Sequence, residues 1–200
     1  MNHNHHETYN QLVQKANEVF SEQGFCSTNL IDITDALGIS RGPIYYYFKD
    51  KIGLYDAAFD KFDHDVREAH GRIIQLNKPF QEFVEDVIFD CVERNTLYGP
   101  YFFFGIESSS ELKDIKVKYD KMNDDIFQEK IDYVNQSKLK NEIHPDADPR
   151  KIADLIYIVF YGLLTSIQKG SILDVSEQNI RALIRALIRG IMQYSKDLSV

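Results

Sequence analysis

Apolar residues recur at spacings of three and four along most of the chain from Tyr9 onward, which is the pattern of amphipathic helices. The first such segment carries its apolar positions at Leu12, Val13, Ala16, Val19 and Phe20. Gly24 is expected to end it, because glycine adopts the left-handed conformation found just beyond helix ends. No segment shows the strict alternation of a strand. The pattern therefore predicts an all-α chain.

Short helices are expected next. Thr28 or Asn29 can cap a helix that ends at Gly38, since their side chains accept hydrogen bonds from the first free backbone N–H groups. A further helix begins at Ser40, and Asp50 caps a longer one. The stretch thus predicts a compact group of three helices followed by a fourth, longer helix.

The remaining chain predicts longer helices. One begins at Pro79 and is interrupted at Gly99-Pro100, because proline suits the first turn of a helix and breaks its interior. A polar helix is expected over residues 112–139. Two strongly apolar helices, over residues 152–167 and 180–191, close the chain.

Composition narrows the class of protein. The 200 residues hold 23 basic and 31 acidic side chains, for a net charge of −8, and 44% are hydrophobic. That excludes a disulfide-stapled miniprotein, a disordered acidic tail and a collagen-like repeat. The acidic balance also argues against coating nucleic acid by bulk charge, although it leaves room for a small local patch that reads a short site.

The chain is expected to be cytoplasmic. The longest apolar run, Leu155 to Leu164, is about half the length needed to span a bilayer, and no signal peptide opens the sequence. Cys26 and Cys91 are interpreted as buried thiols rather than a bridge, which fits a reducing compartment. Residues 1–8, which are polar and rich in histidine, are expected to be disordered.

The segment over residues 28–51, TNLIDITDALGISRGPIYYYFKDK, predicts a helix-turn-helix. Gly38 can take the positive φ that the turn requires. Arg41 lies at the start of the second helix, where its guanidinium can read guanine O6 and N7, and nearby hydroxyls can donate to phosphates. The residues expected to contact DNA are Thr28, Ser40, Arg41, Gly42, Pro43, Tyr45, Tyr46, Tyr47 and Lys51.

Residues 9–55 resemble the DNA-binding domain of the TetR family of bacterial transcriptional regulators. The matching text is Phe20-Ser21-Glu22-Gln23-Gly24-Phe25, Thr28, Ile33, Gly38-Ile39-Ser40-Arg41-Gly42, and Ile44-Tyr45-x-x-Phe48 before Lys51. The resemblance implies a DNA-binding domain over residues 9–52 and a helical ligand-binding and dimerisation domain over residues 53–200. It places Tyr45 and Lys51 at phosphate-contacting positions and residues 41–46 in the helix that reads the groove.

Two features depart from the family pattern. Thr34 stands where the family has a small alanine, which predicts slightly looser packing between the helices. Residues 1–52 hold four basic and six acidic side chains, so nonspecific DNA affinity is expected to be weak and its salt dependence shallow.

The larger domain is unusually aromatic, which indicates an apolar ligand pocket. The aromatic side chains favour a lipophilic or aromatic ligand, and carboxylates on the same helices leave a cationic one as an open alternative. The residues expected to line the pocket are Phe59, Phe62, Phe83, Val87, Asp90, Tyr101, Phe102, Phe103, Glu107, Tyr119, Tyr157 and Tyr161.

Alternatives remain open for what this domain does. His64, His70, His144 and Tyr133 allow haem ligation, although no metal-ligand spacing supports a metal site, and no cofactor is expected. A protein partner could replace the small molecule. A helical ligand carrier or an enzyme is a further alternative, but no catalytic constellation is present.

The two closing helices predict a dimer interface, because apolar stripes on consecutive helices let a partner chain complete a four-helix bundle. The residues assigned to it are Leu155, Val159, Gly162, Leu163, Ser166, Ile180, Leu183, Ile184, Leu187, Ile188 and Ile191. A symmetric pair would place two reading helices on a palindromic operator. The sequence thus favours a ligand-responsive dimeric repressor. It leaves open which ligand acts, and whether that ligand releases or promotes DNA binding.

Overall fold

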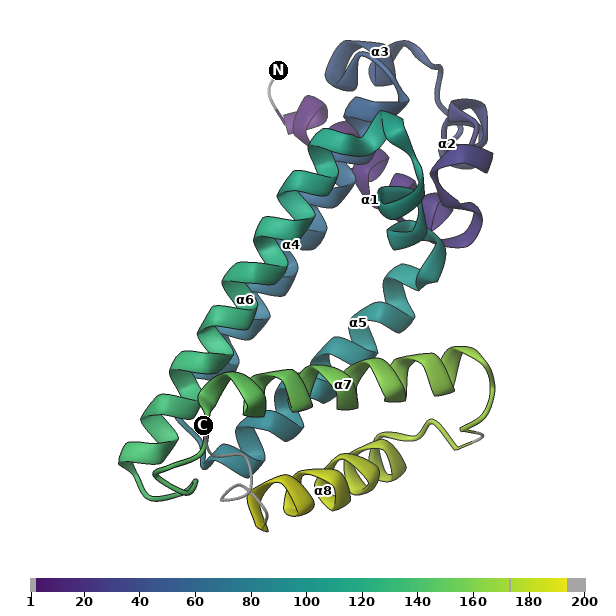
Figure 1. Cartoon of the computed structure of the whole chain (residues 1–200). Coiled ribbons are helices and arrows are strands. Elements are labelled where there is room, and N and C mark those ends of the chain that lie inside the picture. Colours follow the sequence, from purple (N-terminus) through teal and green to yellow (C-terminus); the bar gives the residue numbers. More distant parts are fainter. Residues whose placement is uncertain (1–2, 173, 194–200) are drawn as a thin grey trace. The chain divides into compact units, whose positions relative to one another are not determined.

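The computed structural model describes residues 3–172 and 174–193, in which every regular element is a helix (Figure 1). The elements are α1 (His3–Ser27), α2 (Leu30–Leu37), α3 (Gly42–Phe48), α4 (Lys51–Gln75), α5 (Phe80–Ser108), a 3-10 turn (Ser110–Leu112), α6 (Lys113–Leu139), α7 (Pro149–Gln168) and α8 (Glu177–Gln193). The predicted all-α class is confirmed.

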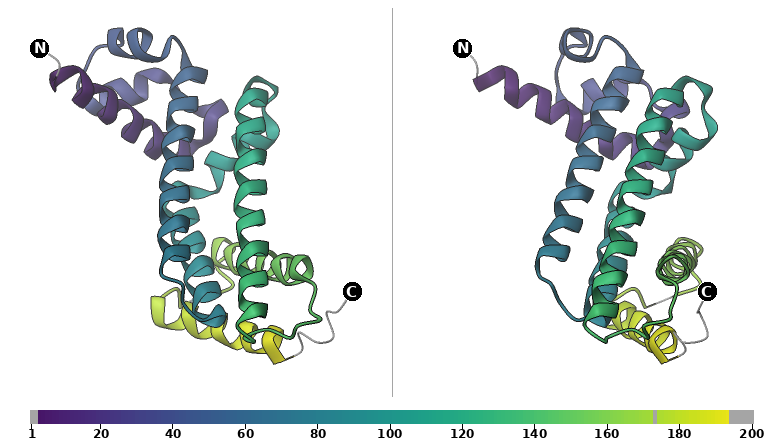
Figure 2. Two further views of the ribbon diagram at one scale, coloured as in Figure 1. Left: turned by 90° about the vertical axis from the view of Figure 1, so that its left-hand side faces the viewer. Right: turned by 60° about the vertical axis from the view of Figure 1, so that its left-hand side comes forward.

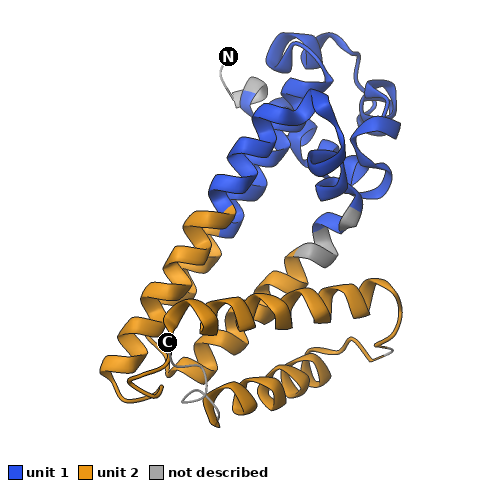
Figure 3. Ribbon diagram, viewed as in Figure 1, with its two compact units in different colours: residues 1–66, 96–122 blue, residues 67–95, 123–200 orange. Residues whose placement is uncertain are grey.

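The chain divides into two compact units (Figure 3). The first unit comprises residues 1–66 and 96–122, and the second comprises residues 67–95 and 123–200. The predicted boundary at residue 52 differs from this division, because the first unit also takes the start of α4, the end of α5 and the start of α6. Helices α1 to α3 gather around the start of α4 in both views of Figure 2.

The helix ends follow the predicted capping chemistry. The Asn29 side chain accepts a hydrogen bond from the Ile31 N–H at 3.2 Å, so Asn29 rather than Thr28 caps α2. Asp50 accepts from the Gly53 N–H at 2.8 Å at the start of α4. One expectation fails. Helix α1 begins at His3, so residues 3–8 are helical rather than disordered, while residues 1–2 lie outside the described chain.

An aromatic cluster forms the core of the first unit. Tyr55 of α4 is fully buried; it contacts Phe20 edge-on and stacks on Phe102 of α5 with ring centroids 4.9 Å apart. Helix α5 kinks at Gly99, where φ is 66°. A Cβ at Gly99 would lie 2.7 Å from the Ser21 carbonyl oxygen, so only glycine permits this close approach of α5 to α1.

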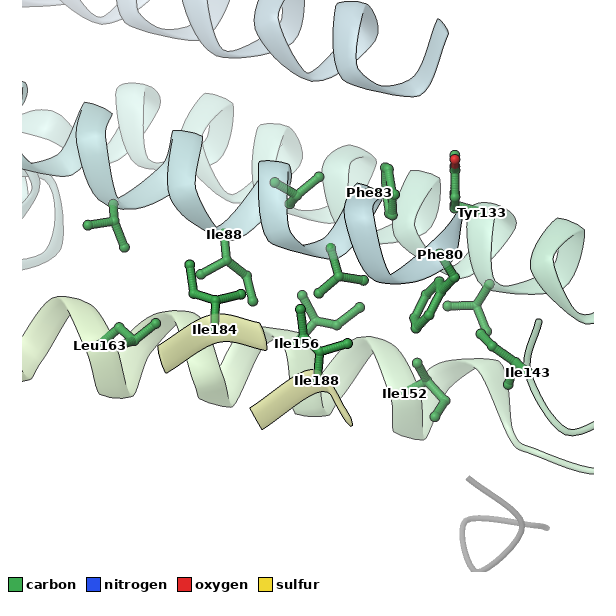
Figure 4. Packing of buried hydrophobic residues seen from close by; sticks show 14 of the residues in the cluster. Phe80, Phe83, Ile88, Tyr133, Ile143, Ile152, Ile156, Leu163, Ile184 and Ile188 are labelled. Carbon is green, nitrogen blue, oxygen red and sulfur yellow. The ribbon is translucent and has the colours of Figure 1, made fainter. Parts of the chain in front are cut away.

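The second unit has an aliphatic core. Buried side chains of α5, α6, α7 and α8 pack together, as the close view in Figure 4 shows. They include Phe80, Ile88, Val134, Ile152, Ile156, Leu163, Ile180, Ile184 and Ile188. The apolar stripes that the sequence shows on α7 and α8 are therefore largely used within the chain itself.

Ion pairs add to the contact between α5 and α8. The Arg185 guanidinium donates to both oxygens of Glu85, at 2.7 and 2.8 Å. Arg181 donates to Glu85 at 3.3 Å and to Asp86 at 3.0 Å. The Glu85 side chain is only 9% exposed, and its hydrogen bonds from Arg185 hold the pKa of its carboxyl below the usual value near 4.5. Two arginines of α8, Arg181 and Arg185, thus have a structural role.

Glu85→Gln is expected to destabilise the protein by about 1–3 kcal/mol at pH 7, because it weakens hydrogen bonds between charged groups at a buried position. Because folding depresses the pKa of Glu85, its contribution is present above the unfolded-state pKa and is lost as pH falls through the folded-state value. Urea unfolding of both proteins between pH 7 and pH 3 should show the difference shrinking. Glu177→Gln, which alters an exposed pair with Arg181, is the matched control and should cost less than about 0.5 kcal/mol. Equal effects of the two substitutions would contradict the assignment.

Candidate DNA-binding surface and effector site

A tight turn and a small core set the angle between α2 and α3. Gly38 has φ 65° and its N–H donates to the Asp35 carbonyl oxygen, which closes the end of α2. Ile33 and Ile44 are fully buried between the helices. Thr34 is also buried, and its hydroxyl donates to the Ile31 carbonyl oxygen at 3.0 Å, so the extra polar group has a partner within its own helix. The predicted helix-turn-helix geometry is present.

The start of α3 presents polar side chains to solvent. Ser40, Arg41 and Gly42 are exposed, and Tyr45 and Tyr46 are 55% and 74% exposed. Pro43 occupies the first turn, and half-buried Tyr47 packs edge-on against Tyr9 at 5.7 Å. Large exposed aromatic rings beside a basic side chain are unusual on a helix that only packs. This surface matches the one that sequence reasoning assigned to DNA.

Two predicted DNA contacts have different roles here. Thr28 is buried, and its hydroxyl donates to the Gly24 carbonyl oxygen at 2.7 Å, so it closes the end of α1, and its DNA contact stays a prediction. The Lys51 ammonium donates to the carbonyl oxygens of Phe25 and Thr28, at 2.9 and 3.2 Å, and lies 4.4 Å from the centre of the Phe25 ring. Lys51 therefore stabilises the carbonyl end of α1, and its phosphate contact stays a prediction.

The predicted pocket residues do not form a single lining within either unit. In the first unit, the buried ring of Phe62 contacts the rings of Phe59, Phe102 and Phe103. The Tyr119 ring contacts those of Phe59 and Phe103. In the second unit, Phe83 stacks on Tyr133 with centroids 3.5 Å apart, and Val87 is buried beside them in the same core cluster. Tyr157 and Tyr161 are each 45% exposed on α7. For most of these rings, core packing is the observed role.

Three of the carboxylates considered for a cationic ligand already hold basic side chains. Asp90 accepts two hydrogen bonds from Arg94, each at 2.9 Å. Asp86 pairs with Lys78 at 2.6 Å, and Glu107, which is exposed, pairs with Lys116 at 3.2 Å. The described residues therefore offer little unpaired negative charge near the predicted lining.

Each unit has a hollow that is lined by described residues. A mainly apolar groove of 430 Å³ lies between the ends of α1 and α5, and Cys26, Tyr101 and Phe104 are among its lining residues. Cys26 is exposed there rather than buried as predicted. A charged cleft of 710 Å³ lies beside the ion pairs of Glu85, where Arg189 completes the basic lining. Of the predicted pocket residues, only Tyr101 lines either hollow.

Two of the residues considered for haem ligation have other contacts in the structure. Tyr133 donates its hydroxyl to the Lys78 carbonyl oxygen, and His144 lies beside Asp146 in the loop before α7. Among the described residues, no group of three His, Cys, Asp or Glu side chains could hold a metal ion.

The predicted dimer residues divide into two groups. Leu163, Ile180, Ile184 and Ile188 are buried in the core of the second unit, so their assignment to a dimer face is wrong. Gly162, Leu183 and Leu187 are exposed, and Leu155, Val159, Ser166 and Ile191 are partly buried. Exposed Ile158 and Tyr161 extend the apolar surface, which sequence reasoning did not assign to this face. We call Ile158, Tyr161, Gly162, Leu183 and Leu187 the outer α7–α8 face.

Comparison with known proteins relates the first part of the chain to a known family. Residues 12–58 match the family described as bacterial regulatory proteins, tetR family. This part of the chain is therefore similar to TetR-family regulators. Over 62 residues it is 37% identical to the HTH-type transcriptional regulator AcrR of Shigella flexneri, a match that spans 31% of this chain and 29% of that protein. The first curated relatives are thus matched over about a third of their length or less.

Longer matches are more distant. The HTH-type transcriptional regulator UidR of Escherichia coli K12 is 23% identical over 197 residues, which is 94% of each chain. The crystal structure of a TetR transcriptional regulator from Chloroflexus aurantiacus superposes with a TM-score of 0.77 at 24% identity, covering 95% of this chain and 96% of that one. The similarity in fold therefore covers nearly the whole chain and not only the helix-turn-helix. The relatives named here are transcriptional regulators.

The position of Lys51 predicts a structural effect that is independent of DNA. Lys51→Met should lower stability by about 1–2 kcal/mol, because two carbonyl oxygens at the end of α1 lose a charged donor. Lys49→Met removes the same charge from an exposed position and should change stability by less than about 0.5 kcal/mol. Thermal unfolding without DNA measures both, and an unchanged melting temperature for Lys51→Met would refute the assigned contact.

Proposed function

We propose that this chain is a dimeric transcriptional repressor of the TetR family that binds a palindromic operator in the cytoplasm and is released by a small lipophilic or aromatic effector. The exposed start of α3 is the observation that carries the proposal. A TetR-family regulator, CifR, has been solved with a 26 bp operator duplex; it superposes with a TM-score of 0.69 at 17% identity, covering 90% of this chain and 94% of that one. That relation supports DNA as the partner of α3.

The side chains of α3 divide recognition between bases and phosphates. Arg41 is the only basic side chain among the residues assigned to the start of α3, so base reading in the major groove falls to its guanidinium. Tyr45, Tyr46 and Ser40 carry hydroxyls that can donate to phosphate oxygens without adding charge. Because few charges neutralise phosphates, specificity should depend on α3 more than on general electrostatic attraction.

Arg41→Ala should relax base preference at one position in each half-site, with a loss of about 1–3 kcal/mol for the preferred sequence. An operator is first selected from random duplexes, and binding to it and to single-base variants is then measured by fluorescence anisotropy. Arg72→Ala removes the same charge from the exposed end of α4 and is the matched control. Unchanged base preference in the Arg41 variant would remove the residue from base reading.

The outer α7–α8 face is the surface that we assign to the dimer. Ile158 is 62% exposed and Leu187 is 48% exposed, while a Cβ at Gly162 would meet no atom within 4 Å. Helix α7 is long and apolar enough to resemble a membrane span, although core helices of soluble proteins meet the same criterion. Burial of this face against a second copy would remove its apolar surface from water and complete a four-helix bundle.

Leu187→Glu should convert the dimer to a monomer, because it places two symmetry-related charges in an apolar interface. Sedimentation velocity at micromolar concentration measures the change, and operator affinity should fall with it. Leu139→Glu is the control, since Leu139 is 86% exposed on α6, away from this face. A variant that remains dimeric would place the interface elsewhere.

An effector acts only if it prefers one conformational state over the other. Fold neighbours take chemically different ligands. FadR of Bacillus subtilis was solved with stearoyl-CoA, and a putative regulator from Saccharomonospora viridis was solved with choline, at TM-scores of 0.69 and 0.68. Similarity to this family therefore supports a small-molecule effector without selecting its charge. For a cationic effector, the paired states of Asp86, Asp90 and Glu107 provide little support.

A further inference from the structure

Ionisable side chains from two helices meet inside the second unit. His70 on α4 is 5% exposed, and Lys130 on α6 is 8% exposed. Lys130 directly follows Glu129, whose carboxylate oxygen lies 3.3 Å from Nε2 of His70, and the positive charge of Lys130 contributes to the lowered pKa of His70. Removing polar groups from water without partners costs free energy. A cluster of this kind therefore needs a compensating interaction.

His70 has an unused hydrogen-bonding atom. Its Nε2 is buried without a hydrogen bond, although a Glu129 carboxylate oxygen lies 3.3 Å away. Burial, reinforced by the charge of Lys130, lowers the pKa of His70 to about 4. The ring is therefore neutral at pH 7, and in the tautomer that carries hydrogen on Nε2 it offers a buried donor.

Lys130 has no carboxylate partner among the described residues, whose ion pairs involve other basic groups. Asp90, which also acts on His70, has both carboxylate oxygens bonded to Arg94 at 2.9 Å. The Lys130 ammonium thus adds positive charge beside the donor of His70, and the fixed negative charge nearby is already neutralised. A donor and a cation together favour an anion.

Aromatic side chains lie beside His70. The Phe83 ring centroid lies 6.4 Å from that of His70, and Phe83 stacks on Tyr133, which follows Lys130 by about one turn on α6. Val87 and Val134 belong to the same buried cluster. If a molecule binds His70 and Lys130 through an anionic group, the rest of that molecule would therefore contact aromatic and aliphatic side chains of the protein.

We propose that His70 and Lys130 are the anion-accepting end of the effector site, and that the effector is amphipathic, with one carboxylate or similar oxyanion on an apolar body. This rests on the proposed function as an effector-responsive regulator. Nε2–H of His70 donates to the oxyanion, and the Lys130 ammonium pairs with it. The Glu129 side chain is 47% exposed, so it can turn into solvent when the effector anion occupies the position beside Nε2.

The test uses matched acids and alcohols on the full chain. Binding of 4-phenylbutyrate and decanoate is compared with that of 4-phenylbutan-1-ol and decan-1-ol by isothermal titration calorimetry at pH 7. We expect at least one acid to bind tenfold or more tightly than its alcohol. Lys130→Met should weaken that acid tenfold or more and leave the alcohol within twofold. Glu129→Gln should strengthen the acid several-fold, because a like charge is removed. Lys121→Met, on an exposed part of α6, is the control and should change neither.

Three results would overturn the proposal: neither acid binds, the acid and its alcohol bind equally, or Lys130→Met leaves acid affinity unchanged. Because Glu129→Gln should gain affinity, a loss of folding in the Lys130 variant does not remove the test. If inorganic phosphate binds as tightly as the acids and its binding also requires Lys130, the proposal that the effector has an apolar body is overturned. Operator binding is measured on the same preparations to distinguish failure of the anion site from failure of the proposed function. A protein that binds its operator but neither acid would refute only the anion site.

Discussion

The packing of Tyr55 is the interaction on which the DNA-binding domain depends. Its ring contacts Phe20 and Phe25 of α1 and stacks on Phe102 of α5, and its hydroxyl donates to the Phe102 carbonyl oxygen. This arrangement requires the close approach of the α5 backbone to α1 that Gly99 allows. The reading helices are therefore one compact unit with residues 96–122, which explains why a boundary at residue 52 does not describe the packing.

Local chemistry made the helices and the reading surface predictable. Periodic apolar positions, the cap at Asn29 and the left-handed Gly38 act within a few residues, so one sequence contains all the information that they need. The exposure of Arg41, Tyr45 and Tyr46 follows from the same periodicity, because Ile44 must face α2. The role of Lys51 could not be predicted in this way, since its two carbonyl partners lie more than twenty residues earlier in the chain.

The predicted pocket and dimer residues show the limit of periodicity. An apolar stripe identifies the face of a helix that is buried but not the surface that buries it. Ile184 and Ile188 satisfy the stripe of α8 within the core of their own unit, whereas Leu183 and Leu187 form the exposed edge of the same helix. Aromatic residues are equally ambiguous, because Phe59 and Phe62 fill a core as readily as they would line a ligand site. Only the tertiary structure distinguishes these uses.

Inside the second unit, a buried ionisable group with partners has a structural role, whereas buried groups without such partners are candidates for ligand binding. Glu85 is nearly buried and fully paired with arginines, as a group that holds α5 to α8 must be. His70 and Lys130 are similarly buried, but Nε2 of His70 makes no hydrogen bond, and no ion pair of Lys130 occurs among the described residues. They lie on α4 and α6, helices that continue into the first unit and there carry Tyr55 and Tyr119. An anion that binds both side chains would therefore contact two helices whose backbones continue into the unit that contains α3.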